Sequence, residues 1–510
     1  MRRPYFSSLV AFSAILLSSC CWGSESPTNR WIVKFRTEQS AVKASSSPAQ
    51  VIHGMQNELA NNLGMISSKV SPLVQTERLW AASSIAVTAS PEQIKELSAC
   101  PNVECVYPVQ YRKWFNDVPS QTALSSTRSV QWGVEKIRAS EVWDKYKVDG
   151  SGVVVGHIDS GIDAHHPLLA GKILMFKDFT ANHSSELTDE AGHGTHTAGT
   201  ICGAGGVGVA PGAKLIVAKI FDAHGGANDE VVLKSMQWIM DPDGNPDTND
   251  FPRVISNSWG DKPEDETATD ARALFQAVQS WVALGIIPVF SAGNDGPSGH
   301  VGRPACFPNA WAVGSTNSSD AISFFSSIGP SSWNGISYTK PDVSAPGSKV
   351  VSCKAGSTGL VAKDGTSMAC PHVAGLVALM LQANPKLTVN EIREKAEATS
   401  KDLGNPGKDN KFGTGRVDSF ACISSIAPQT PLSNLVEGYK MALETEMALT
   451  GGLTSVSPLA SPMADYLFEK ARSLDEGEFS SFKNAYSNDN RVKDLLNQMT
   501  SVRMFDSLQK

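Results

Sequence analysis

Val153-Val154-Val155-Gly156-His157-Ile158-Asp159-Ser160-Gly161 is a short apolar run that ends in an acidic residue and a turn. Its length and its valines are typical of a strand buried on both faces of a parallel sheet. Three more runs of this kind occur at 214–220, 254–258 and 286–290. Apolar residues at helical spacing lie between them, at 231–240 and 269–284. Residues 131–424 are therefore predicted to form an α/β domain with an open, mostly parallel sheet and helices on both faces.

Three segments of this predicted domain carry chemically active residues. Asp159 directly follows a strand, at the carboxyl edge where open α/β sheets bind ligands, although a lone aspartate there can equally cap a turn. His193-Gly194-Thr195-His196 begins a predicted helix of small residues, which can hold a histidine rigidly. Gly365-Thr366-Ser367-Met368 places a serine at the start of an apolar helix. Pro371 is expected to be tolerated because the N–H groups of a first helical turn have no acceptor within the helix.

Together these segments resemble the subtilisin-like serine proteases, in which Asp, His and Ser occur in this order with these surrounding residues. Chymotrypsin-like enzymes and α/β-hydrolases have other orders. The resemblance covers about residues 30–424. It implies a subtilisin-like fold and a serine endopeptidase that hydrolyses peptide bonds through an acyl-enzyme intermediate.

The reaction explains why these residue types are needed. Serine is a weak nucleophile at neutral pH, so a neutral imidazole must accept its proton and later return it to the leaving amine. The resemblance assigns Ser367 as nucleophile and His193 as base, with Asp159 fixing the imidazole tautomer and stabilising the imidazolium. It further implies that the side-chain amide of Asn294 and the N–H of Ser367 bind the oxyanion.

The resemblance also indicates which residues bind substrate. The segment around Asn257 resembles the family strand that pairs with an extended peptide, and the segment before Asn294 continues the same cleft. The expected substrate-binding residues are Ser258, Trp259, Gly260, Ala292 and Gly293. Trp259 replaces a smaller aliphatic residue and either narrows the primary pocket or covers the sheet edge, so the preferred side chain is not predicted.

Residues 30–113 read as a small α+β domain with strands near 31–35 and 103–109 and helices at 50–63 and after Ser90. This unit resembles the inhibitor-type (ferredoxin-like) propeptide of the same enzymes, which acts as a chaperone and temporary plug; a stable accessory domain is the alternative. Residues 114–130 are rich in serine and threonine and are expected to be an exposed linker. Self-processing is expected between Tyr111 and Arg128.

Both ends of the chain differ from these domains. Residues 1–22 are predicted to be an export signal, because two arginines precede an apolar run from Tyr5 to Leu17 and then small residues. Leu17-Ser18-Ser19-Cys20 also resembles the lipobox of bacterial lipoproteins, in which an acylated cysteine is a membrane tether; ordinary signal cleavage before Ser24 is the alternative. Residues 425–510 are predicted to be a helical extension, either an interaction or sorting segment or a spacer.

Composition excludes several classes of protein. Hydrophobic residues make up 41% and charged residues 19%, which is ordinary globular usage. Lysine and arginine number 44 against 51 acidic residues, a net charge of −7, so nucleic acid is not an expected partner. The glycines at 203–208 satisfy a dinucleotide-binding pattern, but a helix precedes them and a strand follows, the reverse of that motif.

No cofactor is expected for the chemistry, and a metal site is left open. His193 and His196 lack the spacing and the glutamate of a zinc protease. Residues 241–250 place acidic and amide side chains at alternating positions, as calcium loops do, yet Pro246 stands where an EF-hand needs glycine. A solvated acidic loop and a structural calcium site are the two interpretations.

Two other activities compete with endopeptidase. A relative without catalysis could bind peptides in the same cleft, and an exopeptidase or esterase could use the same triad. Parallel assays on casein, a small ester and a tripeptide amide separate these alternatives.

Overall fold

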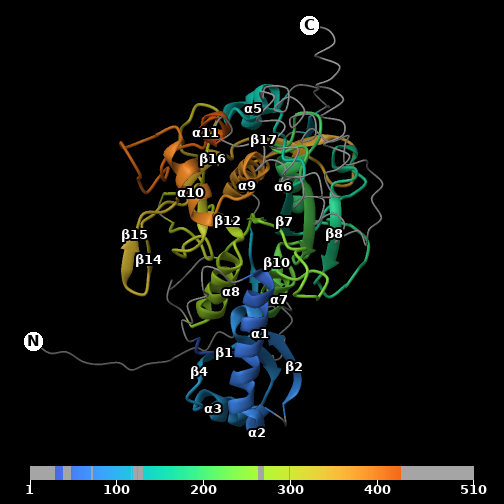
Figure 1. Cartoon of the computed structure of the whole chain (residues 1–510), viewed down its shortest axis with the longest axis vertical. Helices are drawn as coiled ribbons and strands as arrows, with labels where there is room; N and C mark the ends of the chain where they lie inside the picture. Colours follow the sequence, from blue (N-terminus) through green and yellow to red (C-terminus); the bar gives the residue numbers. More distant parts are fainter. Residues whose placement is uncertain are drawn as a thin grey trace, which may run out of the picture.

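The computed structural model describes residues 29–37, 47–70, 73–115, 118, 123–124, 130–261, 269–297 and 299–426. A smaller N-terminal unit lies against one side of a larger unit (Figure 1). The predicted export signal and the C-terminal extension beyond Ile426 lie outside the described residues.

A seven-stranded sheet forms the centre of the larger unit, in the order β16-β13-β12-β11-β7-β9-β8. Every neighbouring pair in it is parallel. The strands are β7 (Val154–Asp159), β8 (Ile173–Asp178), β9 (Lys214–Lys219), β11 (Val254–Asn257), β12 (Ile287–Ser291), β13 (Trp311–Thr316) and β16 (Val343–Pro346). The predicted open, mostly parallel α/β sheet is confirmed.

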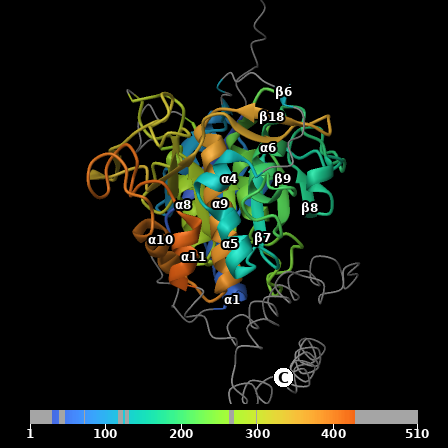
Figure 2. The same ribbon diagram turned by 90° about the horizontal axis from the view of Figure 1, so that it is seen from above.

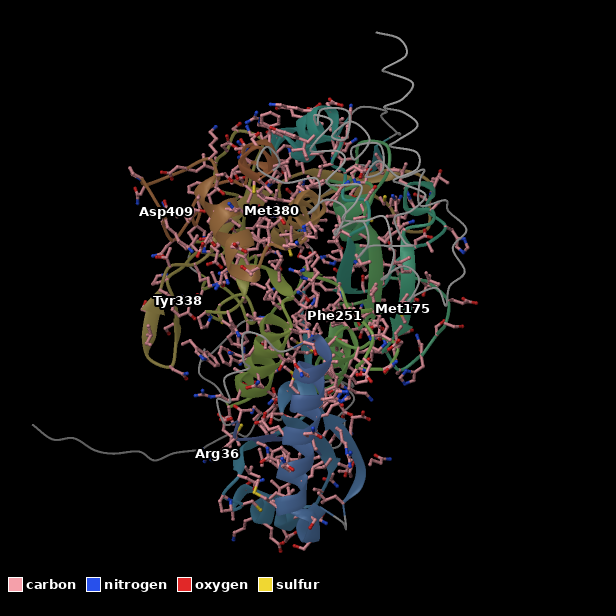
Figure 3. All side chains as sticks on the ribbon, in the orientation of Figure 1. Arg36, Met175, Phe251, Tyr338, Met380 and Asp409 are labelled. Atoms are coloured by element: carbon pink, nitrogen blue, oxygen red, sulfur yellow. The ribbon has the colours of Figure 1, made fainter. Side chains whose placement is uncertain are left out.

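Helices cover both faces of this sheet and enclose one apolar core on each side. The first core includes α6 (His193–Cys202) and α9 (Thr366–Ala383), and the second includes α7 (Asp229–Trp238) and α8 (Ala271–Ala283). α9 is long and apolar enough to cross a membrane, but all of its residues are buried inside the protein. It runs through the middle of the larger unit (Figure 2), and its Met380 lies in the core (Figure 3).

Shorter elements complete the larger unit. Its other helices are α4 (Trp132–Lys136), α5 (Ala139–Tyr146), η2 (Pro167–Leu169), α10 (Val389–Ala398) and α11 (Ser419–Ile426). Its small antiparallel pairings involve β6 (Ala123–Leu124), β14 (Ser331–Trp333), β15 (Ile336–Tyr338), β17 (Val350–Cys353) and β18 (Leu360–Lys363).

The N-terminal unit is an antiparallel four-stranded sheet with helices, in the order β2-β3-β1-β4. Its elements are β1 (Arg30–Phe35), α1 (Pro48–Met65), α2 (Ser67–Val70), β2 (Val74–Leu79), η1 (Trp80–Ala82), β3 (Ser84–Thr88), α3 (Pro91–Ser98) and β4 (Val103–Pro108). Ser47 and Ser90 begin α1 and α3 with capping boxes, each followed by proline, as the pattern at Ser90 predicted. The unit has its own apolar core.

The N-terminal unit packs on α7 and α8 of the larger unit (Figure 1). Ser280 Oγ donates to the carbonyl of Ala81 at 2.7 Å, and Gln237 Oε1 accepts from the N–H of the same residue at 3.2 Å. Arg30 forms an ion pair with Glu230 at 2.7 Å. The contact therefore combines a main-chain clamp on η1 with an ion pair at its edge.

The chain leaves this unit through the larger unit instead of through an exposed linker. β5 (Tyr111–Lys113) pairs antiparallel with β10 (Gly226–Asn228). Trp114 and Phe115, which we expected in an exposed linker, are buried to 3% and 8% exposure. The expectation is wrong for these two residues because their aromatic side chains pack into the cleft described below.

Candidate active site

Asp159 ends β7 at the carboxyl edge of the sheet and is fully buried. Its Oδ1 faces His193 Nδ1 at 2.7 Å and accepts the N–H of Ser160 at 2.7 Å, while its Oδ2 accepts the Thr197 hydroxyl at 3.2 Å. Burial opposes ionisation, but the charge of and hydrogen bond from His193 hold the pKa of Asp159 below its ordinary value. The aspartate is thus an ionised carboxylate whose orientation three donors fix.

His193 is the first residue of α6, and the start of that helix is held firmly. Asp189 Oδ2 accepts from both the N–H and the hydroxyl of Thr195 at 2.7 Å, and Ser160 Oγ accepts the N–H of Gly194 at 2.9 Å. These bonds satisfy helix N–H groups that have no acceptor within the helix. A Cβ on Gly194 would lie 2.2 Å from the carbonyl of Gly161, so the close approach of helix and loop requires glycine.

Ser367 is the second residue of α9 and is 5% exposed. Its hydroxyl donates to the carbonyl of Ser258 at 3.0 Å. The phenyl ring of Phe115 stacks on the His193 imidazole, with ring centroids 4.1 Å apart and planes inclined by 17°. The structure thus contains the aspartate–histidine bond, with the serine hydroxyl directed to a main-chain acceptor. The hydrogen bond between a catalytic serine and its histidine often forms only when substrate is bound.

Pro371 lies in the second turn of α9, not in the first turn as we expected. Its missing N–H deprives the carbonyl of Ser367 of its usual helical partner. The hydroxyl of Ser258 donates to that carbonyl at 2.7 Å. Ser258, predicted only as a substrate-binding residue, therefore also completes the hydrogen bonding of the helix that carries Ser367.

Asn294 follows β12 and faces the start of α9. Its Oδ1 accepts two hydrogen bonds of 2.9 Å, from the N–H and from the hydroxyl of Thr366. The same hydroxyl accepts the N–H of Gly293 at 3.1 Å. The oxygen of the amide is therefore engaged by Thr366, and Asn294 lines the cleft together with Ser367. Sequence reasoning missed Thr366 and Thr197, although both stand inside the motifs that identified the site.

Ser367 and Asn294 line a cleft, and the expected substrate-binding residues either line it or adjoin lining residues in the sequence. It is lined by Lys113, Trp114, Phe115, Trp259, Gly260, Asp261, Ser291, Gly293, Asn294, Asp295, Gly302, Thr366 and Ser367. Trp259 is 1% exposed, and its indole N–H donates to the carbonyl of Ile158 at 2.9 Å. Its ring meets Trp114 edge to face at 5.6 Å. Trp259 is thus packed between the sheet and the cleft.

A segment of the same chain occupies this cleft in extended form. The N–H of Trp114 donates to the carbonyl of Gly225 at 2.9 Å, and its carbonyl accepts the N–H of Gly260 at 2.8 Å. Further along the chain, Val118 forms an antiparallel bridge with Asp364, and β6 pairs with β18. The described residues of this segment therefore pair through their main chain with the catalytic unit both before and after residues 116 and 117.

Other residues that drew attention in the sequence lie elsewhere in the structure. His196 is buried and contacts the carbonyls of Val350 and Val361, and burial lowers its pKa to about 3. His372 contacts the carbonyl of Met368 at 2.8 Å. Burial raises the pKa of the Cys370 thiol to about 12. These groups are structural, because each is enclosed and bonded within its own helix or to its neighbours.

Fold and site together define a class of serine hydrolase in which an aspartate at a strand end contacts a histidine at the start of a helix, and a serine stands in the first turn of a second, buried helix. Comparison with known proteins identifies the family. The Subtilase family matches residues 150–415. Subtilisin NAT of Bacillus subtilis subsp. natto is 31% identical over 417 residues, covering 79% of this chain and 95% of that protein. M-protease of Shouchella clausii (strain KSM-K16) is 30% identical over 433 residues, covering 82% of this chain and 99% of that protein.

Bacillopeptidase F of Bacillus subtilis (strain 168) is 34% identical over 390 residues, which cover 69% of this chain but only 26% of that much longer protein. The chain belongs to the subtilase family and is a serine endopeptidase. Subtilases need no cofactor for catalysis.

Proposed function

We propose that this protein hydrolyses internal peptide bonds with Ser367 as nucleophile, His193 as base and Asp159 as the orienting carboxylate. The observation that supports this most directly is the 2.7 Å contact between Asp159 Oδ1 and His193 Nδ1, at a cleft that already holds an extended peptide segment. That contact fixes the tautomer that leaves Nε2 free of a proton and able to accept one.

The reaction runs in two halves. The Oγ of Ser367 bonds to the carbonyl carbon as its proton passes to His193 Nε2, and the oxyanion binds the Asn294 amide and the Ser367 N–H. The C–N bond then breaks, the leaving amine takes the proton, and an acyl-enzyme remains. Water repeats the sequence, with His193 again taking and returning the proton. An extended substrate pairs with β10 on one side and Gly260 on the other, as β5 and Trp114 do.

Fluorophosphonate labelling followed by mass mapping tests this proposal. We expect one label, on the peptide that contains Ser367, and hydrolysis of casein that disappears in Ser367→Ala. An unlabelled protein without casein hydrolysis would contradict it in favour of a peptide-binding relative. Hydrolysis of a small ester or a tripeptide amide without casein hydrolysis would favour an esterase or exopeptidase.

We also propose that residues 30–113, with the segment after them, are an inhibitory propeptide and that the enzyme cleaves itself between Phe115 and Val118. Trp114 pairs with Gly260, which lines the cleft with Ser367, and Val118 forms a bridge with Asp364, three residues before Ser367 in the sequence. These two pairings support one of the three bonds between Phe115 and Val118 as the scissile bond. Sequencing the N-terminus of the processed protein tests the site. Purified Ser367→Ala protein should stay uncleaved; cleavage of it at the wild-type site and rate would exclude self-processing.

For the chain ends, we propose export directed by residues 1–22, with Cys20 as an acylated membrane tether. Metabolic labelling with a fatty acid, comparing Cys20→Ser with wild type, tests the tether separately from export. Deletion of residues 427–510, followed by activity, secretion and surface-attachment measurements, separates an interaction or sorting segment from a spacer.

For the acidic loop, we propose a structural calcium ion bound by Asp241, Asp243 and Asp250, whose carboxylate oxygens lie within 4.8 Å of one another. Asp250 is 1% exposed, and one of its oxygens, like one of Asp241, has no hydrogen-bond partner among the residues that the structure describes. Buried carboxylate oxygens without donors are the ligands that calcium prefers.

Calorimetric titration of the full chain with calcium tests this site. We expect binding to wild type and at least a tenfold loss of affinity in Asp243→Ala. Asp247→Ala is the matched control, because Asp247 lies in the same loop but is 76% exposed and contacts His53. Equal calcium binding by wild type and Asp243→Ala would leave the solvated-loop interpretation.

A further inference from the structure

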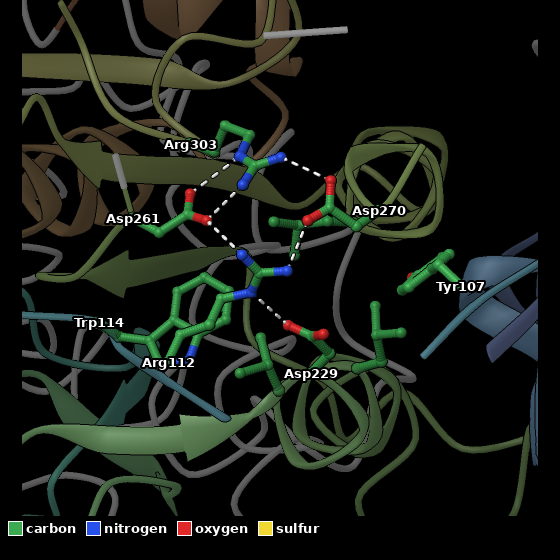
Figure 4. A pocket seen from close by; sticks show the side chains of 10 residues that line it. Tyr107, Arg112, Trp114, Asp229, Asp261, Asp270 and Arg303 are labelled. Carbon is green, nitrogen blue, oxygen red and sulfur yellow. Dashed lines mark hydrogen bonds and ion pairs between the residues drawn. The ribbon is translucent and has the colours of Figure 1, made fainter. Parts of the chain in front are cut away.

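Arg112 belongs to the segment that occupies the cleft, but its guanidinium lies in a separate neighbouring pocket that Asp229, Asp261, Asp270 and Arg303 also line. Its Nε donates to Asp229 Oδ1 at 2.9 Å and its Nη2 to Asp270 Oδ2 at 2.5 Å, while Asp261 Oδ2 lies 3.6 Å from its Nη1 (Figure 4). Its side chain is 19% exposed. One guanidinium thus faces three carboxylates that come from three separate segments of the catalytic unit.

The carboxylates belong to a rigid arrangement. Arg303, on the far side of Asp261 from Arg112, contacts Asp261 at 2.5 Å and Asp270 at 2.9 Å and is 5% exposed. The main chains of Asp261 and Arg303 also exchange hydrogen bonds of 2.9 and 3.1 Å. Asp229 is the first residue of α7, where the helix dipole favours a negative charge. Arg303 therefore positions two of the carboxylates without needing Arg112.

The negative charge of the three carboxylates is complementary to the positive charge of Arg112. Without Arg112, the guanidinium of Arg303 would remain for Asp261 and Asp270, and Asp229 would lose the cation that contacts it. Burial raises the pKa of Asp229 and that of Asp261 above ordinary values; the charge of Arg112 partly offsets this at Asp229, and the charges of Arg303 and Arg112 partly offset it at Asp261. Buried carboxylates that outnumber their cationic partners favour the binding of a further cation. A planar guanidinium suits them because it donates hydrogen bonds to several oxygens in fixed directions.

The position of Arg112 is that of a substrate side chain. It lies in β5, opposite Ala227 of β10, and two residues before Trp114, whose carbonyl accepts from Gly260. The neighbouring Lys113 is exposed and lines the cleft instead of the pocket that holds Arg112. Main-chain pairing binds any sequence, so selectivity at this point must come from the side chain that enters the cluster.

We propose that Asp229, Asp261 and Asp270 form a substrate subsite that selects arginine in polypeptides, with Asp261 and Asp270 held in place by Arg303. The arginine stands two residues before the residue that pairs with Gly260. This inference rests on the proposed function, since it treats the segment through Arg112 as a stand-in for substrate. It adds a specificity determinant distinct from the primary pocket beside Ser367.

Hydrolysis of internally quenched peptides by the processed enzyme tests the subsite. The parent peptide has the sequence of residues 110–120. One variant replaces Arg112 by citrulline, which keeps the shape and removes the charge, and a matched control carries Lys113→Ala. We expect citrulline to lower kcat/KM about 10- to 100-fold, the range for charge-assisted hydrogen bonds, and Lys113→Ala to change it less than about threefold.

The same peptides tested on enzyme variants locate the effect. Asp229→Asn and Asp270→Asn should each shrink the preference for arginine over citrulline. Asp144→Asn, an equal change of charge on exposed α5, should leave the preference intact. Casein hydrolysis with equal rates on the arginine and citrulline peptides would overturn the subsite alone. Failure to hydrolyse casein or any peptide would overturn the proposed function and the subsite with it.

Discussion

Two hydrogen bonds from Thr366 orient the Asn294 amide, one from its N–H and one from its hydroxyl. Thr366 Oγ1 donates to Asn294 Oδ1 at 2.9 Å and also accepts the N–H of Gly293. Thr366 touches no reacting atom in the mechanism, so it is a positioning residue. Loss of the hydroxyl should hold the amide less firmly, because only the bond from the Thr366 N–H remains, while the substrate-pairing main chain stays in place.

For Thr366→Val we therefore predict a fall in kcat of about 3- to 10-fold with little change in KM, from the loss of one hydrogen bond. Thr366→Ser, which keeps the hydroxyl, should retain kcat. Asn294→Ala should lose about 10²- to 10³-fold, the loss known for removal of the oxyanion-hole asparagine of a subtilisin. Steady-state kinetics on one peptide check all three; an unchanged kcat in Thr366→Val contradicts the role of Thr366.

At the scale of the element, Pro371 removes one main-chain N–H donor from α9, and a side chain outside the helix replaces that donor. The carbonyl of Ser367 lacks the N–H of residue 371 and receives the Ser258 hydroxyl at 2.7 Å instead. We predict that Ser258→Ala lowers the free energy of unfolding by about 1–3 kcal/mol, because a buried carbonyl loses its donor.

Pro371→Ala restores an N–H at the place where the donor is missing. In that background Ser258→Ala should therefore cost less than in wild type. Denaturant unfolding of a Ser367→Ala protein carrying these changes measures the coupling without self-digestion. Strict additivity of the two changes would show that the hydroxyl of Ser258 does not act through this carbonyl.

A second prediction for a single element concerns a buried cluster of charged side chains at the edge of the sheet. Asp342, 3% exposed, lies 2.6 Å from Lys340 Nζ, 3.1 Å from Lys408 Nζ and 3.4 Å from Arg393 Nη2. Burial opposes its ionisation, but these three cations lower the pKa of Asp342 well below its ordinary value.

Because the folded pKa of Asp342 is the lower one, its contribution to stability is present above the unfolded pKa of about 3.9 and is lost as pH falls below it. Asp342→Asn should be less stable than wild type at pH 6, by about 3–5 kcal/mol, and the difference should narrow between pH 4 and pH 2. Denaturant unfolding at fixed pH values, again in Ser367→Ala protein, measures this. A difference that stays constant with pH would mean that the charge of Asp342 is unimportant.

Helices and strands could be predicted from the sequence where a short stretch of neighbouring residues specifies them. The apolar run that ends at Asp159 lies within one residue of β7, and the glycine and proline around Ser367 placed the start of α9. The position of Pro371 in α9 was misjudged by a turn, because the helix begins at Thr366 and its compensation comes from Ser258 in another segment. The cluster around Arg112 was not predicted at all. Its members come from β5, α7, the loop after β11 and the loop before β13, and only the folded chain brings them together.

At the scale of the whole molecule, two kinds of charged contact join the two units. One is the buried cluster around Arg112, and the other is a set of ion pairs at the edge of the contact. Arg30 and Glu230, at 20% and 14% side-chain exposure, pair at two points of 2.7 Å, and Lys234 lies 3.4 Å from the more exposed Glu77. Salt screens exposed pairs far more than buried ones. After processing, therefore, ionic strength should control how fast the N-terminal unit leaves.

We predict that processed enzyme gains casein activity several-fold faster at 1 M than at 0.05 M NaCl. Arg30→Gln should release the N-terminal unit about fivefold faster at low salt, corresponding to about 1 kcal/mol for a partly buried bidentate pair, and should respond less to added salt. Lys95→Gln, on α3 away from the contact with α7 and α8, is the charge-matched control. The onset of casein hydrolysis and size-exclusion chromatography measure release independently. Equal release of wild type and Arg30→Gln at every salt concentration would mean that the main-chain clamp on Ala81 and the cleft segment hold the unit without the edge charges.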